Sequence, residues 1–187
     1  ADQIEVCSDL RFDGLTPNFE LIEKIRDDIS VPIKVMIRPR GGGFCYSLSD
    51  LKEIQNQINV FKSIGIEHIV CGILKKNNRV NIDSFKKISD ISYPMKITFH
   101  KAIDKSIDFF NDIEALVRTN RLDSLLTSGQ ANSALEGSET IKKVVNIFGG
   151  NIKVIAAGKI TSTNLINIHE KIGGKYYHGR KILGNLN

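Results

Sequence analysis

The segment that decides the fold reads Arg38-Pro39-Arg40-Gly41-Gly42-Gly43-Phe44-Cys45-Tyr46-Ser47. It follows a β-branched run over 31–37 and precedes a helical pattern that begins near Ser49. A strand therefore ends in two arginines, and a run of glycines follows it. Arginine at a strand end is costly unless it meets an anion, a carboxylate or solvent, and glycine lets the backbone approach a partner closely. The segment predicts either an anion site or an arginine pair that holds the loops together.

Strand-like and helix-like segments alternate along the whole chain. Apolar runs typical of buried parallel strands lie near 3–7, 31–38, 68–72, 95–100, 123–127, 153–156 and 175–178. Amphipathic helical segments lie near 19–28, 49–64, 82–91, 109–119, 134–148 and 163–172. This alternation predicts an α/β protein with a parallel sheet, in a single domain over residues 1–187.

Two parallel-sheet architectures compete. An open, doubly wound sheet usually carries a glycine fingerprint after its first strand, and residues 9–17 lack it. A (β/α) barrel places polar residues at the ends of many strands, as this chain does. We therefore expect a TIM-type (β/α) barrel. Seven strands are one short of eight, and the chain enters a strand soon after Ala1, so we expect the first β-α unit of the barrel to be missing.

Composition narrows the function classes. The 187 residues carry a net charge of +5 and no tryptophan, and the lysines are scattered over several helices. Nucleic-acid binding needs a concentrated basic face, so we expect no nucleic-acid partner. No apolar run reaches the roughly 18 residues of a membrane span, so we expect no membrane partner. Three widely spaced cysteines, Cys7, Cys45 and Cys71, argue against a disulfide framework and favour the cytoplasm.

A polar cluster is expected at the carboxyl ends of the strands. Glu5, Arg38, His100 and His178 all fall at or near strand ends. An arginine can bind a carboxylate or phosphate bidentately, and a histidine can transfer protons near neutral pH. If the protein is an enzyme, which the sequence leaves open, Glu5, Arg38 and His100 are the candidate catalytic residues. The alternative is a structural network without a substrate.

Two further loops suit an anion. Thr127-Ser128-Gly129 and Gly158-Lys159-Ile160-Thr161 follow the last two long strands, where barrels often bind phosphate through backbone amides and a helix N-terminus. The candidate anion-binding residues are therefore Arg38, Arg40, Ser128, Gly129, Gly158, Lys159 and His178. The alternative is an ordinary strand-to-helix turn with a hydroxyl cap.

Several motifs together resemble the copper homeostasis protein CutC family. They are Ile4-Glu5-Val6-Cys7, Gly14-Leu15-Thr16-Pro17, Val35-Met36-Ile37-Arg38-Pro39-Arg40-Gly41-Gly42, Phe44-Cys45-Tyr46-Ser47, Thr98-Phe99-His100-Lys101-Ala102, Leu126-Thr127-Ser128-Gly129-Gln130 and Ser133-Ala134-Leu135-Glu136-Gly137. The resemblance implies a TIM-type barrel, a cytoplasmic location, a homodimer or homotetramer, and a role in copper handling that includes Cu(I) binding.

The chain departs from the family pattern at four places. The first strand of the family, with a cysteine that some members carry there, has no counterpart. The other departures are Ala156-Ala157-Gly158-Lys159 at a glycine-rich turn, Lys101 in place of arginine, and His178-Gly179-Arg180 in place of His-x-Ser. The first departure weakens the expectation of metal binding, and the other three weaken the expectation of an anion site shared with the family.

Cys7 is the leading candidate for Cu(I), because a thiolate is a soft ligand. It ends the first strand in phase with Glu5. A second ligand is expected from Cys71, or from Cys45; the alternative is that these cysteines are small buried residues. The expected function is cytoplasmic Cu(I) binding or handling in copper homeostasis. The alternative is a (β/α)-barrel enzyme that acts on a small anionic or phosphorylated metabolite.

Overall fold

The computed structural model describes residues 1–184 and contains one parallel sheet of seven strands. The strands are β1 (Ile4–Val6), β2 (Ile33–Met36), β3 (His68–Cys71), β4 (Lys96–Phe99), β5 (Ser124–Thr127), β6 (Lys153–Ala157) and β7 (Tyr176–His178). Their order in the sheet follows their order in the chain, from β1 to β7. A doubly wound sheet would reverse its order at a switch point, so this sheet has the singly wound order of a TIM-type barrel, as expected.

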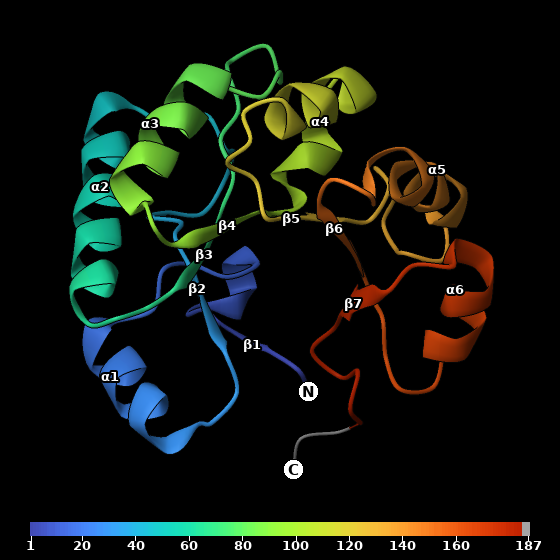
Figure 1. Cartoon of the computed structure of the whole chain (residues 1–187), viewed down its shortest axis with the longest axis horizontal. Coiled ribbons are helices and arrows are strands. Elements are labelled where there is room, and N and C mark those ends of the chain that lie inside the picture. Colours follow the sequence, from blue (N-terminus) through green and yellow to red (C-terminus); the bar gives the residue numbers. More distant parts are fainter. Residues whose placement is uncertain (185–187) are drawn as a thin grey trace.

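Six α-helices alternate with the strands and lie outside the curved sheet (Figure 1). They are α1 (Phe19–Asp28), α2 (Leu48–Ser63), α3 (Ile82–Ser92), α4 (Phe109–Val117), α5 (Ser138–Phe148) and α6 (Leu165–Ile172). Two short 3₁₀ helices, η1 (Leu10–Phe12) and η2 (Lys101–Lys105), follow β1 and β4. None of the helices within residues 1–184 has the length and apolarity needed to cross a bilayer.

The glycine-rich segment leads into a well-capped helix. Ser47 accepts a hydrogen bond from the Asp50 amide, and the Asp50 carboxylate accepts one from the Ser47 amide, which completes a capping box at the start of α2. Ile54, Ile58 and Phe61 then recur on one face of α2 and are buried in the core. Helix α2 therefore begins immediately after the glycine loop that follows Arg38 and Arg40.

Side chains alternate between the two faces of each strand. Val35 and Ile37 belong to the large apolar cluster that joins the sheet to the helices. Lys34, Met36 and Arg38 are therefore on the opposite face, toward the centre of the sheet. The same alternation directs Cys7 and His100 to the centre. Most of the apolar core thus lies between sheet and helices, and the centre is lined largely by polar side chains.

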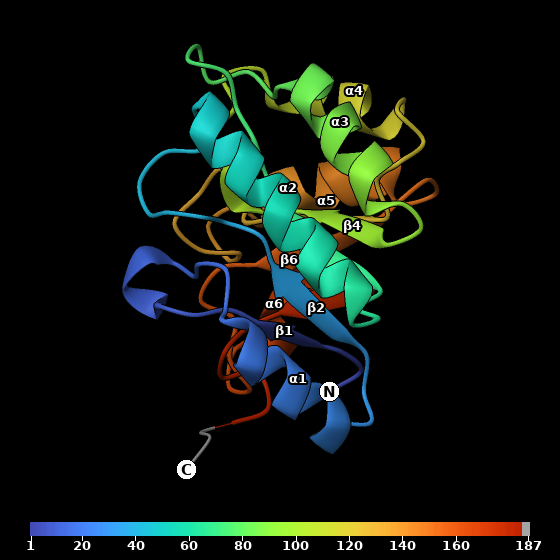
Figure 2. The same ribbon diagram turned by 90° about the vertical axis from the view of Figure 1, so that its left-hand side faces the viewer.

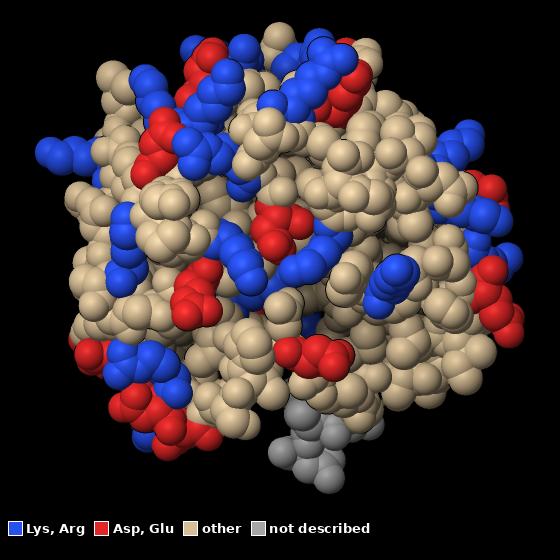
Figure 3. Space-filling model, in the orientation of Figure 1, with Lys and Arg blue, Asp and Glu red and all other residues tan. Residues whose placement is uncertain are grey.

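The two ends of the sheet differ. The loops that follow β1 and β2 lie at one end of the molecule, and the start of the chain lies at the other (Figure 2). Figure 3 shows basic and acidic side chains gathered over the centre of the sheet in the view of Figure 1. The candidate anion residues fall at the carboxyl ends of the strands, so the site is built there.

Candidate functional site

Arg38 follows β2 and holds two loops together, the one after β1 and the glycine loop. Its Nη1 donates hydrogen bonds to the carbonyl oxygens of Phe12 and, at 3.3 Å, Gly14. Its Nη2 donates to the Gly42 carbonyl oxygen at 3.0 Å. The residue is only 5% exposed, and its Nε has no hydrogen-bond partner within the described residues. Arg38 therefore organises the loops and still leaves one buried donor unused.

Arg40 is committed to the same glycine loop. Its Nη1 donates to the carbonyl oxygens of Gly41 and Gly43, both at 3.2 Å, and its Nη2 donates to that of Cys45 at 2.9 Å. Its Nε donates to the Asp50 carboxylate at 3.0 Å. Arg40 therefore holds the glycine loop together. The sequence analysis gave this role as the alternative to an anion site.

His100 follows β4 and is 4% exposed. Its Nδ1 accepts a hydrogen bond from the Ala102 amide at 3.1 Å, so the neutral ring carries its proton on Nε2, and Nε2 has no partner in the described part of the chain. Burial, and then the charge of Arg38, lower the pKa of His100 to about 3. The sequence analysis expected a histidine that titrates near neutral pH, but this ring stays neutral there and acts as a donor.

Two aromatic residues of the glycine loop complete this region. The Phe44 ring lies 5.0 Å from the His100 ring and 4.9 Å from the Arg38 guanidinium carbon. The Tyr46 hydroxyl is buried and makes no hydrogen bond of normal geometry within residues 1–184, and burial raises the pKa of Tyr46 to about 12. Sequence reasoning missed Tyr46. The available signal was its spacing: Phe44 and Tyr46 are separated by one residue, directly after the glycines.

Glu5 lies apart from this region. It pairs in register with Lys34, near the start of β2, and four residues at about 3.3 Å each place Lys34 about 13 Å from Arg38 along the strand. The structure therefore brings Arg38 and His100 together but not Glu5, and the three expected catalytic residues do not form one group.

A second polar group surrounds Lys34 at that lower level. Lys34 Nζ donates to Thr98 Oγ1 at 3.4 Å, and the same hydroxyl contacts His68 Nε2 at 2.8 Å and Ser124 Oγ at 2.7 Å. Burial lowers the pKa of Lys34, and burial followed by the charge of Lys34 lowers the pKa of His68 to about 3. These groups satisfy one another.

The turn after β5 binds a carboxylate from the chain itself. Asp104 of η2 accepts hydrogen bonds from the amide and hydroxyl of Ser128, both at 2.9 Å, from the Gln130 amide at 3.1 Å, and from the Thr127 hydroxyl. The Gly129 amide donates to Thr127 Oγ1 at 2.9 Å. The donors of Ser128 and Gly129 that were expected to bind an external anion are therefore used internally.

The loop after β6 serves packing at Gly158 and leaves Lys159 in solvent. Gly158 has φ +112°, and a Cβ there would lie 3.0 Å from Ser128 Cβ. Its carbonyl oxygen accepts a hydrogen bond from the Ala134 amide at 2.9 Å. Lys159 is exposed. His178 pairs with Ala157 in register and is half-buried at the edge of the sheet. None of these residues contacts the Arg38 and His100 region through a hydrogen bond in the described chain.

The three free cysteines occupy different environments. Cys7 is half-buried on the central face, Cys45 is exposed, and Cys71 is buried in the cluster between sheet and helices. Burial raises the pKa of Cys71 to about 12. Cys7 and Cys71 therefore face opposite sides of the sheet, and the structure does not bring them together as two ligands of one metal ion.

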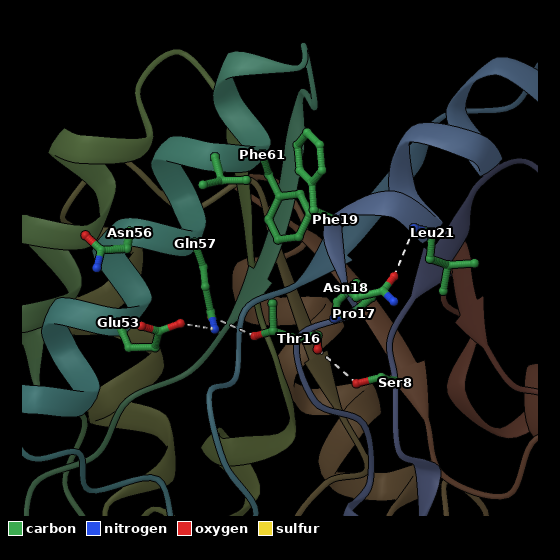
Figure 4. Close-up of a pocket in the computed structure, with 11 residues that line it drawn as sticks. Ser8, Thr16, Pro17, Asn18, Phe19, Leu21, Glu53, Asn56, Gln57 and Phe61 are labelled. Carbon is green, nitrogen blue, oxygen red and sulfur yellow. Dashed lines mark hydrogen bonds between the residues drawn. The ribbon is translucent and has the colours of Figure 1, made fainter.

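No group of three or more His, Cys, Asp or Glu side chains suited to a metal ion occurs among residues 1–184. A cleft of about 470 Å³ lies on the outside, where the start of α1 meets α2 (Figure 4). Its polar groups are paired with one another: Thr16 Oγ1 donates to Gln57 Oε1 at 2.8 Å, and Gln57 Nε2 donates to Glu53 at 2.9 Å. Most of the polar side chains that line this cleft are therefore already engaged with one another or with the backbone.

A singly wound parallel sheet with polar groups at its carboxyl edge defines the (β/α)-barrel class. The model of the CutC family matches residues 1–183. The human copper homeostasis protein cutC homolog is 35% identical over 178 residues, which cover 95% of this chain and 65% of the human protein. A CutC family protein of Glaesserella parasuis is 35% identical over 170 residues, or 91% of this chain and 70% of that protein. The chain belongs to the CutC family, known for copper homeostasis.

Solved structures agree with this assignment. A crystal structure of a CutC protein from Streptococcus agalactiae matches with a TM-score of 0.91 at 27% identity, covering 97% of this chain and 89% of that one. A mandelate oxidase structure matches with a TM-score of 0.59 at 12% identity, covering 95% of this chain and 54% of that one, which reflects the fold alone. This chain spans about two thirds of the length of its human relative.

Proposed function

We propose that this protein binds Cu(I) as its cargo in copper homeostasis, through the thiolate of Cys7 and the thioether of Met36. The observation that carries the proposal is their position on neighbouring strands. Val6 pairs with Val35, so Cys7 and Met36 are the next pair and share the central face. A Cβ placed on Gly14 would lie 3.0 Å from Cys7 Sγ and 3.8 Å from Met36 Cε, so both side-chain ends border the same space.

The chemistry of this pair suits the metal. Thiolate and thioether sulfur are soft ligands that select Cu(I). Met36 takes the place that the sequence analysis gave to Cys71, and its sulfur needs no deprotonation. Burial, and then the charge of Glu5, raise the pKa of Cys7 above its usual value of 9.0. The thiol is therefore protonated at neutral pH without metal, and Cu(I) binding releases one proton.

Anaerobic titration of the reduced protein against a chromogenic Cu(I) chelator tests this proposal. We expect Cys7→Ser to abolish chelator-competitive binding and Met36→Leu, which conserves volume, to weaken it by about tenfold, equal to 1.4 kcal/mol. Cys45→Ser, at an exposed cysteine, is the matched control and should bind as wild type does. Equal affinity and stoichiometry in Cys7→Ser and wild type would refute the assignment.

The released proton adds an independent measurement. Below the pKa of Cys7, the apparent affinity for Cu(I) should rise about tenfold for each unit of pH, because one proton leaves per metal ion bound. A pH-independent affinity between pH 6 and 8 would contradict a thiol ligand that is protonated in the metal-free protein.

Two further features of the expected function remain part of this proposal. All three cysteines are free, which suits the reducing environment of the cytoplasm. Self-association into a homodimer or homotetramer is proposed from the family resemblance, and sedimentation analysis of the purified chain would measure it directly.

A further inference from the structure

We propose that Arg38, Tyr46 and His100 form a buried binding site for a small oxyanion, the carboxylate or phosphate group of a small molecule, next to the Phe44 ring. This site adjoins the Cys7 and Met36 pair, because Arg38 donates to the carbonyl oxygen of Gly14, which borders that pair, but it concerns a different ligand.

The first argument is the uncompensated charge of Arg38. The residue is 5% exposed. The described residues form eight ion pairs, and Arg38 takes part in none of them. Its three hydrogen bonds go to neutral carbonyl oxygens. A buried charge is costly unless it is paired, so an anion at this position would supply the missing partner.

The second argument is the set of unused hydrogen-bonding groups. Four buried side-chain atoms lack a partner in residues 1–184, and three of them are Arg38 Nε, Tyr46 Oη and His100 Nε2. Arg38 Nε and His100 Nε2 both carry a proton, and the tyrosine hydroxyl can donate as well. A buried donor without a partner costs about 1–3 kcal/mol. Three donors without acceptors in one region indicate a ligand that brings acceptor oxygens.

Arg38 and His100 follow separate strands and meet at the Phe44 ring, and Tyr46 lies two residues later in the same loop with its ring 5.2 Å from the Arg40 guanidinium carbon. The Phe44 ring contacts both the Arg38 guanidinium and the His100 ring, at 4.9 Å and 5.0 Å. The charge of Arg38 lowers the pKa of His100. Its charge and a weak hydrogen-bonding contact also oppose the effect of burial on the pKa of Tyr46, so the Tyr46 hydroxyl lies close to the Arg38 side chain. His100 and Tyr46 therefore both lie close enough to Arg38 for its charge to act on them.

The donors are also held in place before any ligand binds. The terminal nitrogens of Arg38 are fixed by carbonyl oxygens of three loop residues, and His100 is fixed by the Ala102 amide. Gly72 leaves room for the imidazole, since a Cβ there would lie 2.4 Å from His100 Cε1. Fixed donors bind an anion without further loss of side-chain freedom.

An approach route lies on the outer side of Phe44. A cleft of about 350 Å³ is lined by Gly42, Gly43, Phe44, Cys45, Leu74, Lys75, Lys76, Asn78 and Lys105. The three lysines in this lining are exposed and give the cleft a positive potential that attracts anions. Phe44 lines this basic cleft and also contacts Arg38 and His100, so the cleft lies beside the buried donors.

The test compares two probe anions with chloride at matched ionic strength, by calorimetric titration of the metal-free chain. Inorganic phosphate and acetate distinguish the two possible ligand groups. We expect one of them to bind wild type, and Tyr46→Phe to weaken that binding by about tenfold, because one hydrogen bond to a charged group is lost. Tyr93→Phe, at an exposed tyrosine, is the matched control and should bind as wild type does.

Stability and spectroscopy separate a binding role from a structural one. Because the Tyr46 hydroxyl makes no hydrogen bond of normal geometry within residues 1–184, Tyr46→Phe without ligand should unfold at the same temperature as wild type or higher. In wild type, the ¹⁵N resonance of His100 Nε2 should shift on titration with the bound anion. Binding of neither probe above chloride, equal binding to Tyr46→Phe, or an unmoved His100 resonance would each overturn the proposal. Cys7→Ser should leave anion binding unchanged, so failure of the copper proposal is a separate result.

Discussion

Asp104 is expected to be among the most important carboxylates for the stability of this fold, and its replacement gives the sharpest test of the structure. It accepts four hydrogen bonds from Thr127, Ser128 and Gln130. After Asp104→Ala, the Ser128 hydroxyl keeps its second acceptor, the Ala131 carbonyl oxygen at 2.8 Å, and the exposed Gln130 amide reaches water. The Thr127 hydroxyl and the Ser128 amide, both in fully buried residues, lose their acceptor.

The magnitude follows from those two donors. At about 1–3 kcal/mol each, their loss should lower the free energy of unfolding by about 4 kcal/mol. For a chain of this size, about 2–4 °C per kcal/mol corresponds to a fall of about 8–16 °C in Tm. Urea unfolding followed by circular dichroism measures the free energy, and a thermal scan measures Tm.

The control and the rescue make this prediction specific. Asp90 has a side chain that is 67% exposed and a single contact, with Arg121 at 3.3 Å, so Asp90→Ala should change stability by less than about 0.5 kcal/mol. Acetate should stabilise Asp104→Ala more than it stabilises wild type, because in the variant it returns a carboxylate to the donors of this turn. A loss below 1 kcal/mol in Asp104→Ala would refute the account of this turn.

Three further outcomes are expected. Gly72→Ala should cost at least about 1–3 kcal/mol in urea unfolding, because its Cβ would meet His100 at 2.4 Å. The pKa values of His68 and His100 are lowered to about 3 in the folded chain, so below pH 6.5 the unfolded chain binds more protons than the folded chain. The free energy of unfolding should therefore fall by about 2.7 kcal/mol per pH unit from pH 6.5 toward pH 4. An unchanged urea midpoint over this range would contradict the burial of these two histidines. In a thiol-reagent assay, exposed Cys45 should react fast and buried Cys71 only on unfolding; rapid reaction of Cys71 would contradict its placement.

Periodicity located the elements well because it reports burial directly. The segment expected to be helical over 49–64 forms α2 at Leu48–Ser63, and the strand expected over 68–72 forms β3 at His68–Cys71. Apolar side chains recur every three to four residues where a helix covers a sheet and form continuous runs in strands covered on both faces.

The candidate site was predicted less completely. Strand-end positions identified Arg38 and His100 correctly as neighbours, because parallel strands end at the same edge. The same reasoning included Glu5, which is paired with Lys34 further down the barrel. It also assigned free donors to the turn after β5, where Asp104 binds them, because local sequence does not reveal which distant carboxylate will reach a turn.

The amino-acid sequence by itself determined the family, the alternation of strands and helices, and the order of the strands, since each follows from local patterns and connected motifs. Only the tertiary structure decided which polar groups are satisfied. Whether a buried donor finds an acceptor depends on atoms from segments far apart in the chain, as for Ser128 with Asp104. In the described part of the chain, Arg38 Nε, the Tyr46 hydroxyl and His100 Nε2 are left without acceptors, and no pattern within a single segment carries that information.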